Sequence, residues 1–116
     1  MDLKMTNITL ESTEKCQILI LNGQFTGGPE TDELNDKFEF ITQTPRPSLI
    51  MDFSNTTYLS SIVIGLLVKM HARFAEKDGK LIISGLNSTL RSVLKMTKVD
   101  TVLHIVETLE EAKSKF

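Results

Sequence analysis

A strand, a long helix and a second strand follow one another between residues 48 and 84, and this succession limits the fold more than any other feature. The segment SLIMDFS at 48–54 has the apolar run of a buried strand, residues 61–77 have the length and apolar content of a helix, and KLIIS at 80–84 is a further strand. Two strands joined by a crossover helix pair in parallel within one sheet. We therefore expect a βαβ unit.

Local signals predict where this unit begins and ends. The segment TPRP at 44–47 cannot belong to a helix interior, because each proline lacks an N–H and restricts the residue before it. Asp78 and Gly79 end the long helix, and Gly79 is expected to adopt the left-handed conformation that commonly follows a helix. Segment 55–61, NTTYLSS, is expected to be a loop at the carboxyl end of the first strand, where α/β sheets collect functional groups.

The rest of the chain adds elements of both kinds. Strands near 5–10 and 16–21 flank the polar segment STEK and predict an antiparallel hairpin that Asn22-Gly23 ends. Further predicted elements are a helix from Gly28-Pro29-Glu30 with Leu34, Phe38 and Ile41 on its core face, a short helix capped by Asn87 or Ser88, a strand at 102–106, and a C-terminal helix with Thr108 and Glu111 as capping box. The sequence thus predicts one α/β domain over residues 1–116, with a mixed β-sheet of about five strands and about four α-helices packed against it.

Composition excludes several classes of function. The 116 residues are 41% hydrophobic and 24% charged with a net charge of -2, so no basic field attracts nucleic acid or anionic lipid. The N-terminal segment MDLKMTNITL lacks the apolar region of a secretion signal, and the run IVIGLLV is too short to span a bilayer. The single cysteine, Cys16, fits a buried position in a reducing cytosol. We expect a cytoplasmic protein that binds neither nucleic acid nor membrane.

Few residues suggest catalysis or metal binding. His71 and His104 have no metal-ligand spacing with Cys16, and Gly27-Gly28 lacks the spacing of a phosphate-binding loop, so no metal and no cofactor are expected. Asp52 is expected to bond the loop that follows it. A hydrolase with Ser61 as nucleophile and His71 as base is a remote alternative, because ten helical residues separate the two by about 15 Å.

Two adjacent serines precede the long helix. Serine is a favoured N-cap, since its hydroxyl accepts a hydrogen bond from an unpaired amide of the first turn. Capping accounts for one of Ser60 and Ser61, and leaves the purpose of the other open.

The ordered pattern of these segments resembles STAS domains, which are named for sulfate transporters and anti-sigma factor antagonists. The segments that carry the resemblance are the strand LIMDFS, the loop NTTYLSS, the apolar helix start with Gly65, the strand and turn KDGKLIISGLN, and the stretch STLRSVLKMTKVDTVLHIVETLEEA. The resemblance covers about residues 22–112 and is closest to stand-alone bacterial anti-sigma factor antagonists. It implies a mixed sheet with helices packed against it.

The resemblance also implies a function. In such antagonists, an Asp-Ser-Ser/Thr-Gly motif before the long helix is phosphorylated on its first serine by a kinase that is also an anti-sigma factor. That serine falls on Ser61, while the Asp falls on Ser60, the second hydroxyl residue on Ile62 and the glycine on Val63. A second family feature, the Asp of a Gly-x-x-Asp turn, falls on Thr26.

We therefore expect a protein-interaction module for partner-switching control of transcription, and not an enzyme. Its partner is expected to be an anti-sigma factor or serine kinase, with phosphorylation at Ser61. The alternative is a scaffold subunit of a signalling assembly that is not phosphorylated. The residues expected to bind the partner are Thr26, Tyr58, Ser60, Ser61, Ile62, Ile64, Gly65 and Val68.

The helix at 61–77 has an apolar arc wider than one sheet contact requires. At 100° per residue, one stripe is expected to pack on the sheet; it consists of Val63, Leu66, Leu67, Met70 and Phe74. A second group consists of Ile64, Val68, Ala72 and Ala75, beside Gly65. Either a neighbouring helix or a partner protein covers this second group, and Gly65 is expected to allow close backbone approach in both cases.

Overall fold

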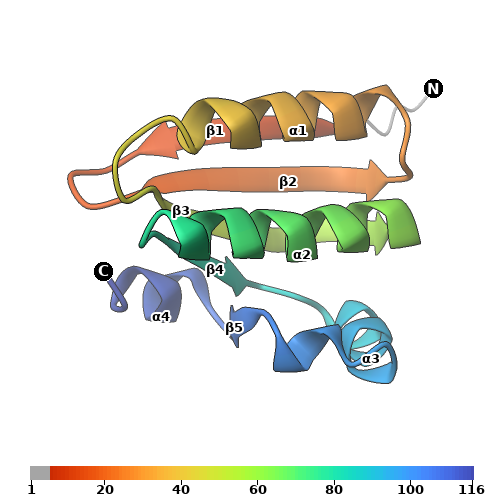
Figure 1. Cartoon of the computed structure of the whole chain (residues 1–116). Coiled ribbons are helices and arrows are strands. Elements are labelled where there is room, and N and C mark those ends of the chain that lie inside the picture. Colours follow the sequence, from red (N-terminus) through yellow and green to blue (C-terminus); the bar gives the residue numbers. More distant parts are fainter. Residues whose placement is uncertain (1–5) are drawn as a thin grey trace.

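A computed structural model of the chain describes residues 6–116 and confirms the predicted α/β architecture (Figure 1). The strands are β1 (Asn7–Ser12), β2 (Gln17–Phe25), β3 (Ser48–Leu59), β4 (Lys80–Ser84) and β5 (His104–Val106). The helices are α1 (Pro29–Ile41), α2 (Ser61–Glu76), α3 (Ser88–Met96) and α4 (Leu109–Lys113), with a 3-10 turn, η1 (Val99–Thr101), after α3. The order of strands and helices is the predicted one.

The strands form one mixed sheet in the order β1-β2-β3-β4-β5. β1 is antiparallel to β2, as the predicted hairpin requires, and the other neighbouring strands are parallel. The pairing of β3 with β4 confirms the βαβ unit. β1 begins at Asn7, and Met5, where the hairpin was expected to begin, lies outside the described residues.

Helices cover both faces of the sheet. α1 and α2 lie side by side over one face (Figure 1), and their buried side chains join those of the sheet in the larger core cluster. α4 covers the other face above a smaller cluster that includes Ile18, Ile50, Ile82 and the buried Cys16. The predicted burial of Leu34, Phe38 and Ile41 on α1 is confirmed.

The predicted helix starts are confirmed because each depends on a local signal. Pro29 is the first residue of α1, where its missing N–H has no partner to lose. Asn87, and not Ser88, caps α3 by accepting a hydrogen bond from the Leu90 amide at 2.8 Å. The Thr108 hydroxyl accepts a hydrogen bond from the Glu111 amide at 3.0 Å, as expected for the cap of α4.

Two strand ends differ from the prediction. β2 does not end at Asn22-Gly23 but continues to Phe25, through an irregular pairing at which Gly23 has φ 101°. β3 likewise continues through the expected loop as far as Leu59. The two extensions pair with each other, and the buried Thr56 hydroxyl donates a 2.6 Å hydrogen bond to the Leu21 carbonyl. Pairing between distant segments therefore overrides the local turn signals.

The turn after α2 also differs from the prediction. Asp78, with φ 58°, is the left-handed residue, and Gly79 is not. Gly79 serves close packing instead, because a Cβ atom there would lie 2.3 Å from the Pro47 carbonyl oxygen. At the other end of the chain, β5 is shorter than the expected strand at 102–106 because η1 precedes it.

Candidate protein-docking site

The structure separates the tasks of the two serines. Ser60 is the N-cap of α2, and its hydroxyl accepts a hydrogen bond from the Val63 amide at 3.3 Å. The Ser60 amide donates to the Phe25 carbonyl at 2.9 Å, which ties the start of α2 to the end of β2. Ser61 is the first helical residue and is exposed. Within residues 6–116 its hydroxyl has no hydrogen-bond partner, so Ser61 is not needed for capping.

The electrostatic setting of Ser61 favours an anion. The first turn of α2 contains no acidic residue. The amides of a first helical turn lack intrahelical partners, and the helix dipole places partial positive charge there. A phosphate group on Ser61 would thus lie where negative charge is stabilised.

Exposed apolar side chains lie close to Ser61 in the sequence, one at the end of β3 and one in the first turn of α2. Tyr58 is 49% exposed and Ile62 is 62% exposed. We call Tyr58, Ser61, Ile62 and Gly65 the α2 amino-end surface. These side chains and the exposed Ser61 hydroxyl make this surface the candidate docking site.

No contact among the described residues requires a glycine at position 65 of this surface. A Cβ atom at Gly65 would meet nothing within 4 Å, so the expectation that a segment of the chain approaches its backbone is wrong. Glycine inside a helix costs about 1 kcal/mol relative to alanine. No contact in residues 6–116 offsets this cost.

The other predicted partner-binding residues lie close to this surface but differ in exposure. Thr26 is exposed, whereas Ser60 and Val68 are half-buried. Ile64 is 7% exposed and belongs to the larger core cluster, which leaves little of it for a partner. Of the predicted core stripe of α2, Val63, Leu67, Met70 and Phe74 are buried and Leu66 is half-buried. Ala72 and Ala75, from the second group, are exposed.

Glu30 is a feature of this corner that the sequence did not indicate as functional. Its Oε2 accepts hydrogen bonds from the Thr26 amide at 2.6 Å, the Thr26 hydroxyl at 2.9 Å, and the Gly27 and Gly28 amides at 3.2 Å each. Partial burial raises the pKa of the Glu30 carboxyl, but the hydrogen bonds from Thr26, its own amide and Gly28 outweigh burial and lower the pKa from 4.5 to about 2.

This carboxylate fixes the loop that supports Ile62. Gly27 has φ 98°, and a Cβ atom there would lie 2.9 Å from Ile62 Cδ1. The Ile62 side chain therefore rests on the loop that Glu30 holds. Thr26, one of the predicted partner-binding residues, belongs to the same loop and is hydrogen-bonded to Glu30 through both its amide and its hydroxyl.

Comparison with known proteins assigns the fold to a family. The family model described as the STAS domain matches residues 7–112, which is most of the chain. The chain belongs to the STAS domain family. This agrees with the resemblance found in the sequence and with the mixed five-stranded sheet.

Solved structures of anti-sigma factor antagonists share the fold of this STAS domain. One from Mycobacterium paratuberculosis superposes with a TM-score of 0.82 at 16% identity, covering 96% of this chain and 93% of that one. The antagonist domain protein of Planctomyces limnophilus gives 0.77 at 20% identity, covering 90% and 93%. The phosphorylated form of the Bacillus cell fate determinant SpoIIAA gives 0.72 at 18% identity, covering 94% and 98%.

A curated relative is much longer than this STAS domain. Prestin from Danio rerio is 28% identical over 95 residues, which are 82% of this chain and 13% of prestin. The chain therefore matches only a small part of that relative. Among the helices of residues 6–116, none combines the length and apolar character that a membrane span requires.

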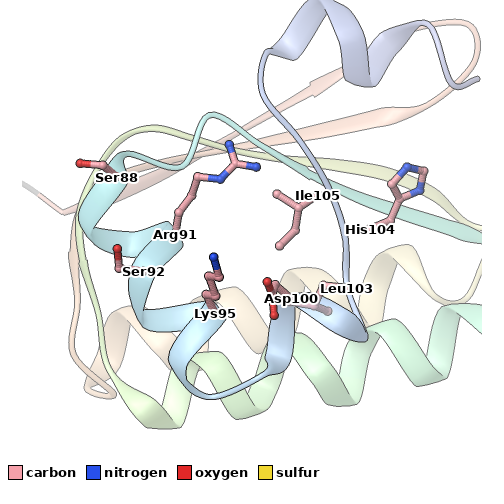
Figure 2. Close-up of a pocket in the computed structure, with 8 residues that line it drawn as sticks. All are labelled: Ser88, Arg91, Ser92, Lys95, Asp100, Leu103, His104 and Ile105. Atoms are coloured by element: carbon pink, nitrogen blue, oxygen red, sulfur yellow. The ribbon is translucent and has the colours of Figure 1, made fainter.

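One hollow of the STAS domain lies away from Ser61, between α3 and β5 (Figure 2). It has a volume of about 700 Å³. Arg91 and Lys95 extend over it from α3, and Arg91 pairs with Glu107 at 3.3 Å. In the described structure no hydrogen bond joins His104 to Ser88 or Ser92 at this hollow, so it contains no nucleophile and base in contact.

The remaining candidate residues have structural surroundings. Asp52 accepts hydrogen bonds from the Ser54 hydroxyl at 2.6 Å and the Ser84 hydroxyl at 3.5 Å, which agrees with its expected structural role. His71 is half-buried on α2 and His104 is exposed on β5. Nowhere in residues 6–116 do three His, Cys, Asp or Glu side chains gather in a way that could hold a metal ion.

Proposed function

We propose that this STAS domain is an anti-sigma factor antagonist, a cytoplasmic interaction module of a partner-switching pathway. Its partner is an anti-sigma factor that is also a serine kinase, and the partner binds over the α2 amino-end surface. Binding releases the sigma factor. Phosphorylation of Ser61 by the partner ends the complex.

The Ser61 hydroxyl, which is exposed and makes no hydrogen bond within residues 6–116, is the observation that carries this proposal. Because Ser60 caps α2, a kinase can modify Ser61 without removing the cap. The Ser61 oxygen would bond to the γ-phosphorus of ATP held by the partner while the bond from that phosphorus to ADP breaks, and a base of the partner would take the hydroxyl proton. All of the catalytic machinery then belongs to the partner, so this chain needs no active site of its own.

Phosphate on Ser61 acts by two opposing effects. Within the chain it is stabilised by the first-turn amides of α2. Toward the partner it adds a charge of about -1.5 to -2 beside the apolar Tyr58 and Ile62 side chains. Transfer of such a charge into an apolar interface is costly, so the modified domain dissociates.

The serine hydrolase alternative has no support in the geometry. Ser61 and His71 both lie on α2, ten residues apart, which corresponds to about 15 Å along a helix. A general base must lie within hydrogen-bond reach of its nucleophile. A serine-directed covalent reagent should therefore leave Ser61 unlabelled.

Affinity capture from native lysate, followed by reconstitution with the purified captured protein, tests the proposal. The baits are wild type, Ser61→Asp, Ser61→Ala and, as matched control, Ser92→Asp on the exposed face of α3. We expect wild type, Ser61→Ala and Ser92→Asp to retain an ATP-binding partner and Ser61→Asp to lose it. The purified partner should phosphorylate wild type but not Ser61→Ala. Equal capture by all four baits would support the scaffold alternative and contradict the switch.

A further inference from the structure

Two surfaces at opposite edges of the domain have exposed apolar centres and opposite charge. The first is a groove between β1 and α1, of about 440 Å³, which we call the acidic groove; it is lined by Leu10, Glu33, Asp36, Lys37 and Phe40. The second is an exposed surface on α3 and η1, which we call the basic knob; it consists of Val93, Lys95, Met96, Lys98 and Val102, of which Lys95 also lines the hollow of Figure 2. The strand order places β1 and β5 at the two edges of the sheet, and Figure 1 shows α1 and α3 at correspondingly distant positions.

Each surface has an apolar centre that the fold leaves in water. Met96 is 82% exposed at the end of α3, with Val102 47% exposed nearby in sequence. In the groove, Phe40 is 65% exposed and Leu10 is 38% exposed. The groove volume equals roughly fifteen water molecules at about 30 Å³ each, which gives room for a flexible methionine side chain.

The charges around these centres are opposite. α1 carries five carboxylates and one lysine. Glu30 is held by the Thr26 loop and Glu39 pairs with Arg73 at 3.1 Å, but in the described structure no ion pair engages Asp32, Glu33 or Asp36. Residues 85–99 contain three basic residues and no acidic one, and the single acid beside the knob is Asp100. The basic knob thus has an exposed apolar centre with basic residues around it. The acidic groove, at the opposite edge, has an exposed apolar centre with acidic residues around it.

We propose that the basic knob of one copy of this chain docks into the acidic groove of a second copy, with Met96 against Phe40 and Leu10. Every copy carries both surfaces, so the complementary partner is always present at the concentration of the chain itself. Because the two surfaces differ and lie on opposite edges, the contact is head-to-tail and extends into open chains of molecules. The α2 amino-end surface takes no part in this contact, so the inference does not depend on the proposed function.

Sedimentation velocity of two variants and their mixture tests this arrangement. We expect wild type to form a concentration-dependent series of species that shifts toward monomer when NaCl is raised from about 50 to about 500 mM, because salt screens the rims. Met96→Asp disrupts the apolar centre of the knob and Phe40→Asp that of the groove, so each variant alone should remain monomeric. Both side chains are largely exposed, so neither substitution disturbs the core, and circular dichroism checks this.

The mixture distinguishes head-to-tail contact from symmetric pairing. Met96→Asp retains the groove and Phe40→Asp retains the knob, so equal amounts should form a one-to-one dimer and nothing larger. Ala75→Asp, at an exposed position of α2 outside the knob, the groove and the α2 amino-end surface, is the matched control and should associate as wild type does. The proposal is overturned if wild type stays monomeric at low salt, if either single variant associates as wild type does, or if the mixture gives no dimer.

Charge reversal supplies an independent check. Lys95→Glu and Glu33→Lys should each weaken association about tenfold, and the two changes in one chain should restore it because the rims are again opposite. Failure of the double variant to regain association would show that these rims do not meet.

Discussion

The two ends of α2 are built in opposite ways. At its carboxyl end the chain turns through Asp78 and Gly79 against Pro47, whose carbonyl also accepts the Lys80 amide at 2.8 Å. At its amino end, Ser60 satisfies the cap while Ser61, Ile62 and Gly65 face water. The carboxyl end is explained by contacts within the chain, whereas the amino end is not.

Gly65 and Gly79 differ in the same way as the two ends of α2. Gly79 is required because another segment occupies the space of a side chain, and Gly65 is present although that space is empty. A glycine that weakens a helix without serving the fold points to a requirement outside the chain. The comparison therefore favours a partner that approaches the α2 backbone at Gly65.

The largest effect on stability is expected at the carboxyl end of α2. Gly79→Ala places a Cβ atom 2.3 Å from the backbone oxygen of Pro47, so the turn must move, and the free energy of unfolding should fall by about 3 kcal/mol. Urea denaturation measures this change. Asp78→Gly is the control, since glycine accepts the φ of 58° without strain and should keep or raise stability. Equal stability of Gly79→Ala and wild type would remove the contrast between the two ends.

The capping assignment predicts a smaller loss at the amino end. Ser60→Ala removes the acceptor for the Val63 amide and should lower the free energy of unfolding by about 1 kcal/mol. Ser61→Ala, its neighbour, should change stability by less than about 0.5 kcal/mol because an exposed hydroxyl without partners is lost. Thermal and urea unfolding of both variants measure the difference. A reversed order of the two effects would assign the cap to Ser61.

Gly65→Ala should separate stability from binding. Alanine fits the open space and raises the free energy of unfolding by about 1 kcal/mol, while its methyl group weakens binding of the partner. Urea unfolding and titration with the captured kinase measure the two quantities. Ala72→Gly, at an exposed position of the same helix, is the converse control: it should lower stability and leave binding unchanged. Unaltered binding by Gly65→Ala would place the docking surface elsewhere.

A pH-dependent effect concerns Glu30 in the loop that contacts Ile62. Since the pKa in the folded state is about 2 and the ordinary value is 4.5, the ionised carboxylate contributes its full stability above about pH 4.5 and loses it as the pH falls toward 2. Glu30→Gln removes this contribution. The stability difference between wild type and Glu30→Gln should therefore shrink between about pH 5 and 2.5, as urea unfolding at each pH can measure. A difference that is constant with pH would mean that the carboxylate charge does not hold the loop.

Sequence reasoning succeeded where the cause of a structure is local. The starts of α1, α3 and α4 depend on side chains within a few residues of each start, and hydrophobic periodicity identified most of the core face of α2. It missed the extension of β3 through NTTYL, because a polar segment becomes a strand there only by pairing with β2. The role of Gly79 was assigned wrongly for the same reason, and of the two approaches expected at Gly65 only the one by a neighbouring helix is excluded, because only the folded chain shows which glycine another segment approaches.

The site at Ser61 stays a prediction, which came from the resemblance to STAS domains. The division of tasks between Ser60 and Ser61 was not predictable from the sequence, because it required the cap geometry. Glu30 gave no sequence signal beyond an acid in a first helical turn. Its convergent bonds to three loop amides and the Thr26 hydroxyl arise from the loop conformation at Gly27 and Gly28.

The dissociation constant of the purified kinase partner for this domain, with and without phosphoserine at position 61, tests the central claim most directly. The account predicts that the phosphate raises the dissociation constant at least about tenfold, equivalent to about 1.4 kcal/mol, while the fold is retained. Equal dissociation constants for the two forms would contradict it, because the amino end of α2 would then be a capped helix whose charge no partner senses.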